Sequence, residues 1–256
     1  MAKISSSRFC NIDYVFYWSL FIFSLLIFTF KVNGSILIST NEPIKNKTSI
    51  LQATEKLKSN LPNDAINILL KIKLNSSTQE DLKLAFSVNS LLGDCYSRFS
   101  DKKLIAMQNY QEAKNLAAKL KDLLKLGDIY HKIGLCSFEM GKIEDARKAF
   151  NLAIECKTHL YGKDHISLAL EYNGIGSLYF FAHNLDKALE NYKKALFIGV
   201  KFKAFYPDNA MFYQNVAIVY ASNGDYDNAS LYFKYSGAVN KNVYGEKSLA
   251  IAQFYL

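Results

Sequence analysis

Glycine and proline are scarce in this sequence, with 12 and 3 copies among 256 residues. Because strands and tight turns use these residues heavily, their scarcity favours a helical fold. Cysteine is also rare, and the four copies form no Cys-x-x-Cys pair, which argues against a zinc ribbon and a disulfide-stapled scaffold. Half of the residues are hydrophobic and 21% are charged, a globular balance that excludes wholesale disorder.

Motifs for catalysis and for cofactor binding are missing as well. There is no Gly-x-Ser-x-Gly, His-Glu-x-x-His or phosphate-binding loop, and Gly174 and Gly176 supply only part of a dinucleotide motif, inside a helical pattern. Cys156, His159 and His165 lack the paired spacing of a zinc site. The net charge of +8 is spread along the chain between acidic residues. We therefore expect no enzyme activity, no metal, no cofactor and no nucleic-acid partner.

Residues 14–30 form an uncharged apolar segment, YVFYWSLFIFSLLIFTF. Its 17 residues exceed the usual core of a signal peptide, about 7–15 residues, and reach the lower limit of a membrane span, about 17–25. Phenylalanine and leucine occur on every side, whereas a soluble amphipathic helix needs a polar stripe. We predict that residues 1–34 are a cleaved signal peptide or a retained membrane anchor helix, which makes the protein periplasmic, extracellular or membrane-anchored. Residues 35–48, with Pro43, are expected to be a linker.

A small residue recurs through the rest of the chain at intervals of 41, 42 and 41 residues, at Gly93, Gly134, Gly176 and Ala217. A second signature follows each copy, with an alanine, an aromatic four residues later and a small residue three later: Ala106-Tyr110-Ala113, Ala146-Phe150-Ala153, Ala188-Tyr192-Ala195 and Ala229-Phe233-Ser236. These spacings place the three residues on one face of a helix. The small residues would let two helices approach closely, and the aromatic ring would fill the space beside them.

This pattern resembles the tetratricopeptide repeat (TPR), a helix–turn–helix unit. The joints, such as Leu160-Tyr-Gly-Lys-Asp-His165, are similar to those of kinesin-light-chain-type repeats of about 42 residues, as in exported bacterial TPR proteins. The resemblance implies an all-α, TPR-type α-solenoid, a right-handed superhelix of repeats. The units are expected at about residues 49–85 (degenerate), 86–126, 127–168, 169–209 and 210–247, with an incomplete unit at 248–256. Asp164 and Asp208 are expected to cap the first helices of two units.

In the TPR family the first helix of each unit lines the concave face, which binds peptides. By repeat register we expect six polar residues to be exposed there: Asp94, Asp128, His131, Asn173, Ser177 and Gln214. Asn173 and Gln214 occupy the same slot in successive units, and their amides can donate to and accept from a peptide backbone. The alternative is that each of these residues is simply a solvated polar side chain.

We predict a non-catalytic protein-interaction scaffold, exported or membrane-tethered through residues 14–30, that binds a peptide or protein segment in this groove. The alternative is the sensor or recruitment region at the N-terminus of a longer protein. The missing output domain would be CHAT-type protease-like, a histidine kinase or DNA-binding. The incomplete repeat at residues 248–256 supports this alternative.

Overall fold

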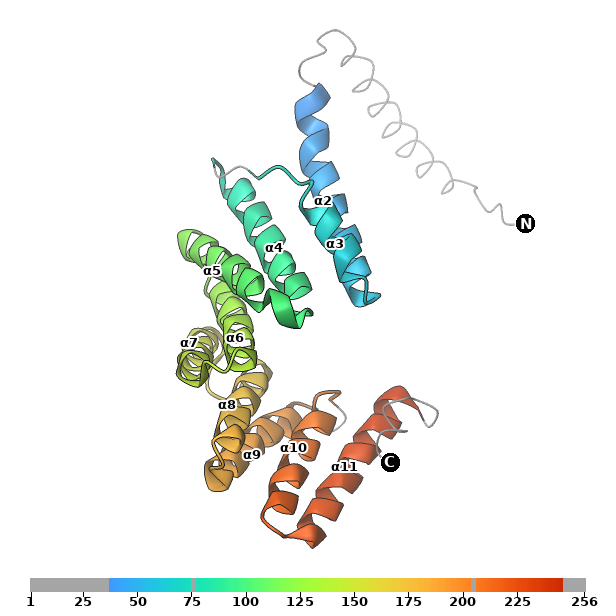
Figure 1. Ribbon diagram of the computed structural model, residues 1–256, viewed down its shortest axis with the longest axis vertical. Helices are drawn as coiled ribbons and strands as arrows, with labels where there is room; N and C mark the ends of the chain where they lie inside the picture. Colours follow the sequence, from blue (N-terminus) through green and yellow to red (C-terminus); the bar gives the residue numbers. More distant parts are fainter. Residues whose placement is uncertain (1–36, 75–76, 204–205, 246–256) are drawn as a thin grey trace, which may run out of the picture. The chain divides into compact units, whose positions relative to one another are not determined.

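Every regular element of the described residues is helical in the computed structural model of the protein (Figure 1). The structure describes residues 37–74, 77–203 and 206–245. The elements are α2 (Leu37–Lys58), α3 (Pro62–Leu69), α4 (Gln79–Tyr96), the 3₁₀ helix η1 (Ser100–Lys102), α5 (Lys103–Lys119), α6 (Leu123–Glu139), α7 (Ile143–Tyr161), the 3₁₀ helix η2 (Ile166–Leu168), α8 (Ala169–Phe181), α9 (Leu185–Phe202), α10 (Asn209–Ser222) and α11 (Tyr226–Tyr244).

The chain divides into two compact units after Gln52. In the compact part before Ala53, residues 37–48, which were expected to belong to a linker, are helical and form the first part of α2. Lysine, leucine and glutamate, which favour helices, follow Pro43 and outweigh that single breaker. The predicted leader, residues 1–34, lies outside the described residues. Within the described part of the chain, no helix is long and apolar enough to cross a bilayer.

The compact part of the chain after Gln52 contains successive helical pairs, as the repeat predicts. Helices α4 and α5, α6 and α7, α8 and α9, and α10 and α11 pack against each other, and each pair also contacts the next (Figure 1). We call α4, α6, α8 and α10 the first helices and α5, α7, α9 and α11 the second helices. The first of these pairs begins at Gln79, earlier than expected, because Thr78 and Asp81 form a capping box at the start of α4.

The recurring glycines make room for aromatic rings. Phe150 of α7 is 1% exposed and lies between Gly134 of its own unit and Gly174 of the next. A Cβ at either glycine would come within 2.8 Å of the ring. Gly93 faces Tyr110, and Gly176 faces Tyr192, in the same way. The repeat signature is thus confirmed as the contact that joins the two helices of a unit.

The turns inside the units need a left-handed residue. Gly141 and Gly224 have φ of 73° and 79° at two of these turns, and His183 has φ of 56° at a third. In the first of them, the Gly141 N–H donates to Phe138 and the Lys142 N–H to Ser137, which satisfies the last carbonyls of α6. The recurrence of glycine there follows from this backbone conformation.

The two predicted aspartate caps do not form. His165 precedes the turn of η2 and accepts a hydrogen bond from the Ser167 N–H, so α8 begins later, at Ala169. Asp164 instead pairs with Lys201 of α9 at 2.8 Å. Asp208 occupies the N-cap position of α10, but its side chain makes no capping hydrogen bond. The inserted 3₁₀ turn separates Asp164 from the helix that it was expected to cap.

Candidate peptide-binding face

A cavity of about 560 Å³ opens among α4, α5 and α6, and two of the six predicted residues line it. Asp94 comes from α4 and His131 from α6. The lining carries charges of both signs together with apolar carbon: Leu57, Asp94, Ser97, Arg98, Tyr110, His131, Lys132, Leu135, Cys136 and Glu139. We call it the Asp94 cavity.

Asp94 joins two units rather than standing free. Its carboxylate accepts a hydrogen bond of 2.6 Å from Lys132 of the next first helix and one of 3.0 Å from the Tyr110 hydroxyl. Lys132 also donates to Ser90 at 2.9 Å. Burial, reinforced by the negative charge of Asp94, raises the pKa of Tyr110, so its hydroxyl remains a donor.

His131 and Asp128 belong to a second charged group, around Glu171. Glu171 is fully buried; it accepts a hydrogen bond of 2.7 Å from Lys157 and lies 2.7 Å from His131 Nδ1. Lys157 is 6% exposed and also lies 3.4 Å from the Asp128 carboxylate. Contacts from α6, α7 and α8 therefore meet at one buried carboxylate.

Asn173 and Ser177 are also engaged with neighbouring groups. Asn215 of α10 donates to the Asn173 side-chain oxygen at 2.7 Å. The Ser177 hydroxyl donates to the Asn173 carbonyl and accepts from the Tyr192 hydroxyl, each at 3.1 Å. These contacts hold both side chains in place on α8, and Asn173 is also tied to α10.

The six predicted residues thus fall into two groups. Asp128 and Gln214 are exposed, whereas the others are half-buried and hydrogen-bonded as described above. Sequence reasoning missed the groups that hold them, above all Glu171. A signal for Glu171 existed: the same repeat slot holds Val88, Ile129 and Phe212 in the other units, and all are buried. A carboxylate in that apolar slot requires a buried partner.

The cysteines behave as small core residues. Cys95 and Cys136 are buried at the same repeat position, and burial raises the pKa of both thiols, that of Cys95 to about 11. Cys156 is half-buried, and its pKa is also raised by burial. Among the residues whose placement is described, no three His, Cys, Asp or Glu side chains are grouped to hold a metal ion.

The tandem helical pairs define a class, that of helical-hairpin repeat proteins. Residues 125–198 match the family model described as tetratricopeptide repeat. The kinesin-light-chain-like character predicted from the joints is also found among the structural neighbours. No curated protein shows significant sequence similarity to the chain.

Solved structures show the same fold at low sequence identity. BtubC (BKLC) from P. vanneervenii aligns with a TM-score of 0.58 and 18% identity, over 82% of this chain and 93% of that one. A kinesin-light-chain-type protein of Podosopora anserina with nearly identical TPR-like repeats aligns with a TM-score of 0.60 and 14% identity, over 80% and 99%. A STAND ATPase with a TPR sensor from Pyrococcus horikoshii aligns with a TM-score of 0.65 and 17% identity, over 82% of this chain and 30% of that one. These structures share the fold of tandem helical hairpins with this chain.

Proposed function

We propose that the protein is a non-catalytic interaction scaffold whose first helices bind a peptide or protein segment. The observation that carries this proposal is the Asp94 cavity, which combines charges of both signs with an exposed apolar side chain, Leu135. A concave surface with a few fixed polar groups suits an extended segment, because those groups orient its backbone and apolar carbon takes its side chains.

The internal contacts of the face support a preorganised site. Asp94, His131 and Asn173 are held by neighbouring units and therefore lose little conformational freedom when a ligand binds. Gln214 of α10 is exposed and extends the same repeat slot beyond Asn173. The proposed ligand contacts mainly the first helices, and Tyr110 of α5 lines the Asp94 cavity beside them.

Site-specific photo-crosslinking tests this proposal. A benzoylphenylalanine is placed at Leu135 or Gln214, both exposed on first helices, and in matched controls at Leu104 or Phe197, both exposed on second helices. We expect the first-helix probes to crosslink one segment of a partner, mapped by mass spectrometry, and a synthetic copy of that segment to compete. Equal crosslinking from the second helices would contradict the proposed face.

We further propose that residues 14–30 export or tether this scaffold. The uncharged run of 17 residues between Asp13 and Lys31, all aromatic or aliphatic except for two serines and one threonine, supports this proposal. Mass spectrometry of the mature protein tests it. A first residue of Ser35 supports cleavage, an intact Met1 in the membrane fraction supports an anchor, and an intact Met1 in the cytosol contradicts both.

The second candidate function is sensing on behalf of a longer protein. The likeness in fold to the TPR sensor of the Pyrococcus horikoshii STAND ATPase favours it, since that sensor is one part of a larger chain. In this case the same first-helix face would bind the signal, and an output domain would respond. Sequencing the gene beyond the codons for Met1 and Leu256 distinguishes the two candidates, because an output domain in the same reading frame would favour sensing.

A further inference from the structure

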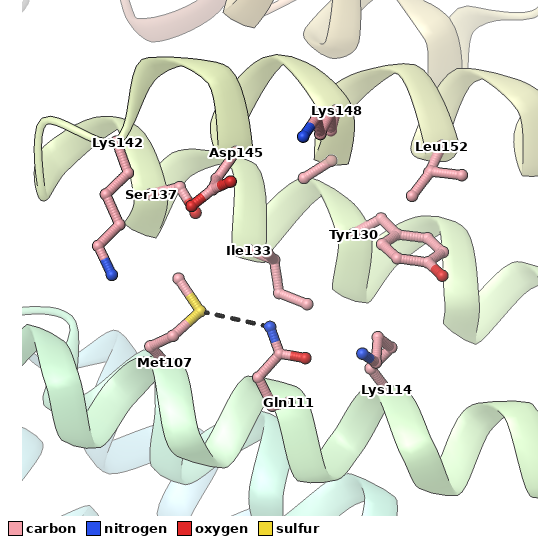
Figure 2. Close-up of a pocket in the computed structure, with 11 residues that line it drawn as sticks. Met107, Gln111, Lys114, Tyr130, Ile133, Ser137, Lys142, Asp145, Lys148 and Leu152 are labelled. Carbon is pink, nitrogen blue, oxygen red and sulfur yellow. Dashed lines mark hydrogen bonds between the residues drawn. The ribbon is translucent and has the colours of Figure 1, made fainter.

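A second cavity, of about 370 Å³, lies on the other side of α6, among α5, α6 and α7 (Figure 2). It shares no lining residue with the Asp94 cavity. We call it the Ser137 pocket. Figure 2 shows the side chains of Met107, Ile133 and Ser137 around its centre.

The pocket coincides with a change in the repeat. Three residues after the recurring small residue, the other units carry tyrosine, at Tyr96, Tyr179 and Tyr220. The unit of α6 and α7 carries Ser137 there, and Ser137 is 2% exposed. A buried serine therefore replaces an aromatic ring, and a side chain of much smaller volume leaves space behind.

Tyr220 shows where such a ring lies. Lys193 of the preceding second helix donates to its hydroxyl at 2.8 Å, and Tyr232 of its own second helix lies 5.5 Å away between ring centroids. Lys193 lies five residues after the repeat alanine of its helix, and Tyr232 lies three residues after that of its own helix. Beside Ser137, the residues at the same two positions are Gln111 of α5 and Ala149 of α7. Both line the pocket.

Tyr179 gives a second, independent match. The Lys187 ammonium lies 5.3 Å from the centroid of its ring. The equivalent of Lys187 in the unit of Ser137 is Asp145, which also lines the pocket. The Ser137 pocket is therefore the volume that a tyrosine ring fills in other units of this chain.

The rim of the pocket carries more positive than negative charge. Lys114, Lys142 and Lys148 line it, against a single carboxylate, that of Asp145 (Figure 2). Cations held near one opening attract carboxylates and orient them around the bound group. Gln111, at the position from which Lys193 bonds the Tyr220 hydroxyl, offers an amide to a phenolic oxygen.

We propose that the Ser137 pocket binds the tyrosine side chain of an acidic segment of a partner protein. The ring fills the volume beside Ile133 and Ala149, the hydroxyl meets the Gln111 amide, and flanking carboxylates meet the three lysines. The segment supplies the ring that this unit lacks. This site goes beyond the proposed function, because it lies on a different side of α6 from the Asp94 cavity.

A defined peptide tests the proposal with the full chain. The probe is a fluorescein-labelled peptide with one tyrosine between pairs of glutamates, read by fluorescence anisotropy. We expect replacement of its tyrosine by alanine, or of its glutamates by lysines, to weaken binding at least about tenfold, as for loss of an anchor residue. Equal binding of the three peptides, or no saturable binding of the first up to millimolar concentration, would overturn the proposal.

Variants of the chain locate the binding. Ser137→Tyr places the repeat's own residue in the pocket and should abolish binding of the probe. Leu104→Tyr adds the same ring at an exposed position of α5 outside the pocket and should bind normally. Circular dichroism checks that both fold. Lys148→Glu changes an exposed residue, so it tests the site even if Ser137→Tyr fails to fold, and it should weaken binding. Normal binding by folded Ser137→Tyr or by Lys148→Glu would refute the proposal.

Discussion

The Lys157 ammonium donates a 2.7 Å hydrogen bond to the Glu171 carboxylate, and both side chains are buried. Lys157 belongs to α7 of one unit and Glu171 to α8 of the next, so the pair crosses an interface between units. Such a pair adds little net stability, because desolvation of two charges offsets their attraction. Removal of one partner is costly, however, since the other charge stays buried.

We therefore expect Glu171→Ala to lower the free energy of unfolding by about 3–5 kcal/mol, measured by urea titration. The matched control is Asp128→Ala, which removes a carboxylate 3.4 Å from Lys157 that is 54% exposed. It should cost less than about 1 kcal/mol, because water solvates the exposed Asp128 carboxylate and Lys157 keeps its hydrogen bond to Glu171. Similar losses in the two variants would show that the burial of Glu171 has no energetic consequence.

Gly174→Ala should destabilise the protein although alanine is the better helix former. Its Cβ would lie 2.7 Å from the Phe150 ring, which is already enclosed by Gly134 on its other side. Overpacking typically costs about 1–3 kcal/mol, more than the roughly 0.5–1 kcal/mol that alanine gains over glycine in a helix. Thermal unfolding measures the difference.

Two further variants control for helix propensity. Gly127→Ala brings a Cβ no closer than 3.2 Å to any neighbouring atom, against 2.7 Å for Gly174→Ala, so it should be better tolerated. Phe150→Leu in the Gly174→Ala background should cost less than Phe150→Leu alone, because the smaller side chain removes the clash. If the effects of Phe150→Leu and Gly174→Ala on the free energy of unfolding were additive, the proposed clash between the two side chains would be ruled out.

The fold could be predicted because its steric requirements recur. Gly134, Phe150 and Ala153 each repeat a contact that every unit must make, so four copies of one spacing specified the helical pairs. The polar contacts of the candidate face do not recur. Glu171 contacts His131, which lies 40 residues earlier in the sequence, so no spacing within one repeat predicts that contact. The helix over residues 37–48 was not predicted for a different reason, because the helix formers that follow Pro43 outweigh this single breaker.

Asn173 and Gln214 share a repeat slot but should differ in their effect on stability. Asn173→Ala removes the acceptor of a 2.7 Å hydrogen bond from Asn215, at an expected cost of about 1 kcal/mol. Gln214→Ala changes an exposed side chain and should stay within about 0.5 kcal/mol of the parent. Denaturant titration of both variants measures the difference. Equal stability of the two variants would mean that the hydrogen bond between Asn173 and Asn215 contributes nothing to folding. Both variants could then be used to test ligand binding without a change in stability.

His183→Gly should stabilise the protein by up to about 1 kcal/mol. His183 has φ of 56°, a left-handed conformation that costs a residue with a Cβ about 1–2 kcal/mol, partly offset by the greater chain entropy of glycine when unfolded. The reverse change at the equivalent turn, Gly141→His, should destabilise. A Cβ at Gly141 meets no atom within 4 Å, so backbone strain alone acts there. Thermal shifts of the same sign in both variants would contradict this account.

Alkaline pH should weaken the fold partly through Cys95. Burial, followed by the charge of Asp94, raises the pKa of the Cys95 thiol from 9.0 to about 11. The folded state therefore holds its proton more tightly than the unfolded state. This contribution is fully present below about pH 9 and is lost as pH rises through 11, at most about 3 kcal/mol at 1.4 kcal/mol per pKa unit.

Urea titrations of the parent and of Cys95→Ala at pH 8 and pH 10.5 measure this loss. Alanine is not ionisable, so the variant should lose less stability than the parent between the two pH values. All other titratable residues are the same in the two proteins, so their effect cancels in the comparison. Tyr110, which shares the Asp94 carboxylate, is retained in both. An equal loss of stability in the parent and in Cys95→Ala would mean that the thiol ionises as easily in the folded state as in the unfolded one. The burial of Cys95 would then have no effect on its pKa.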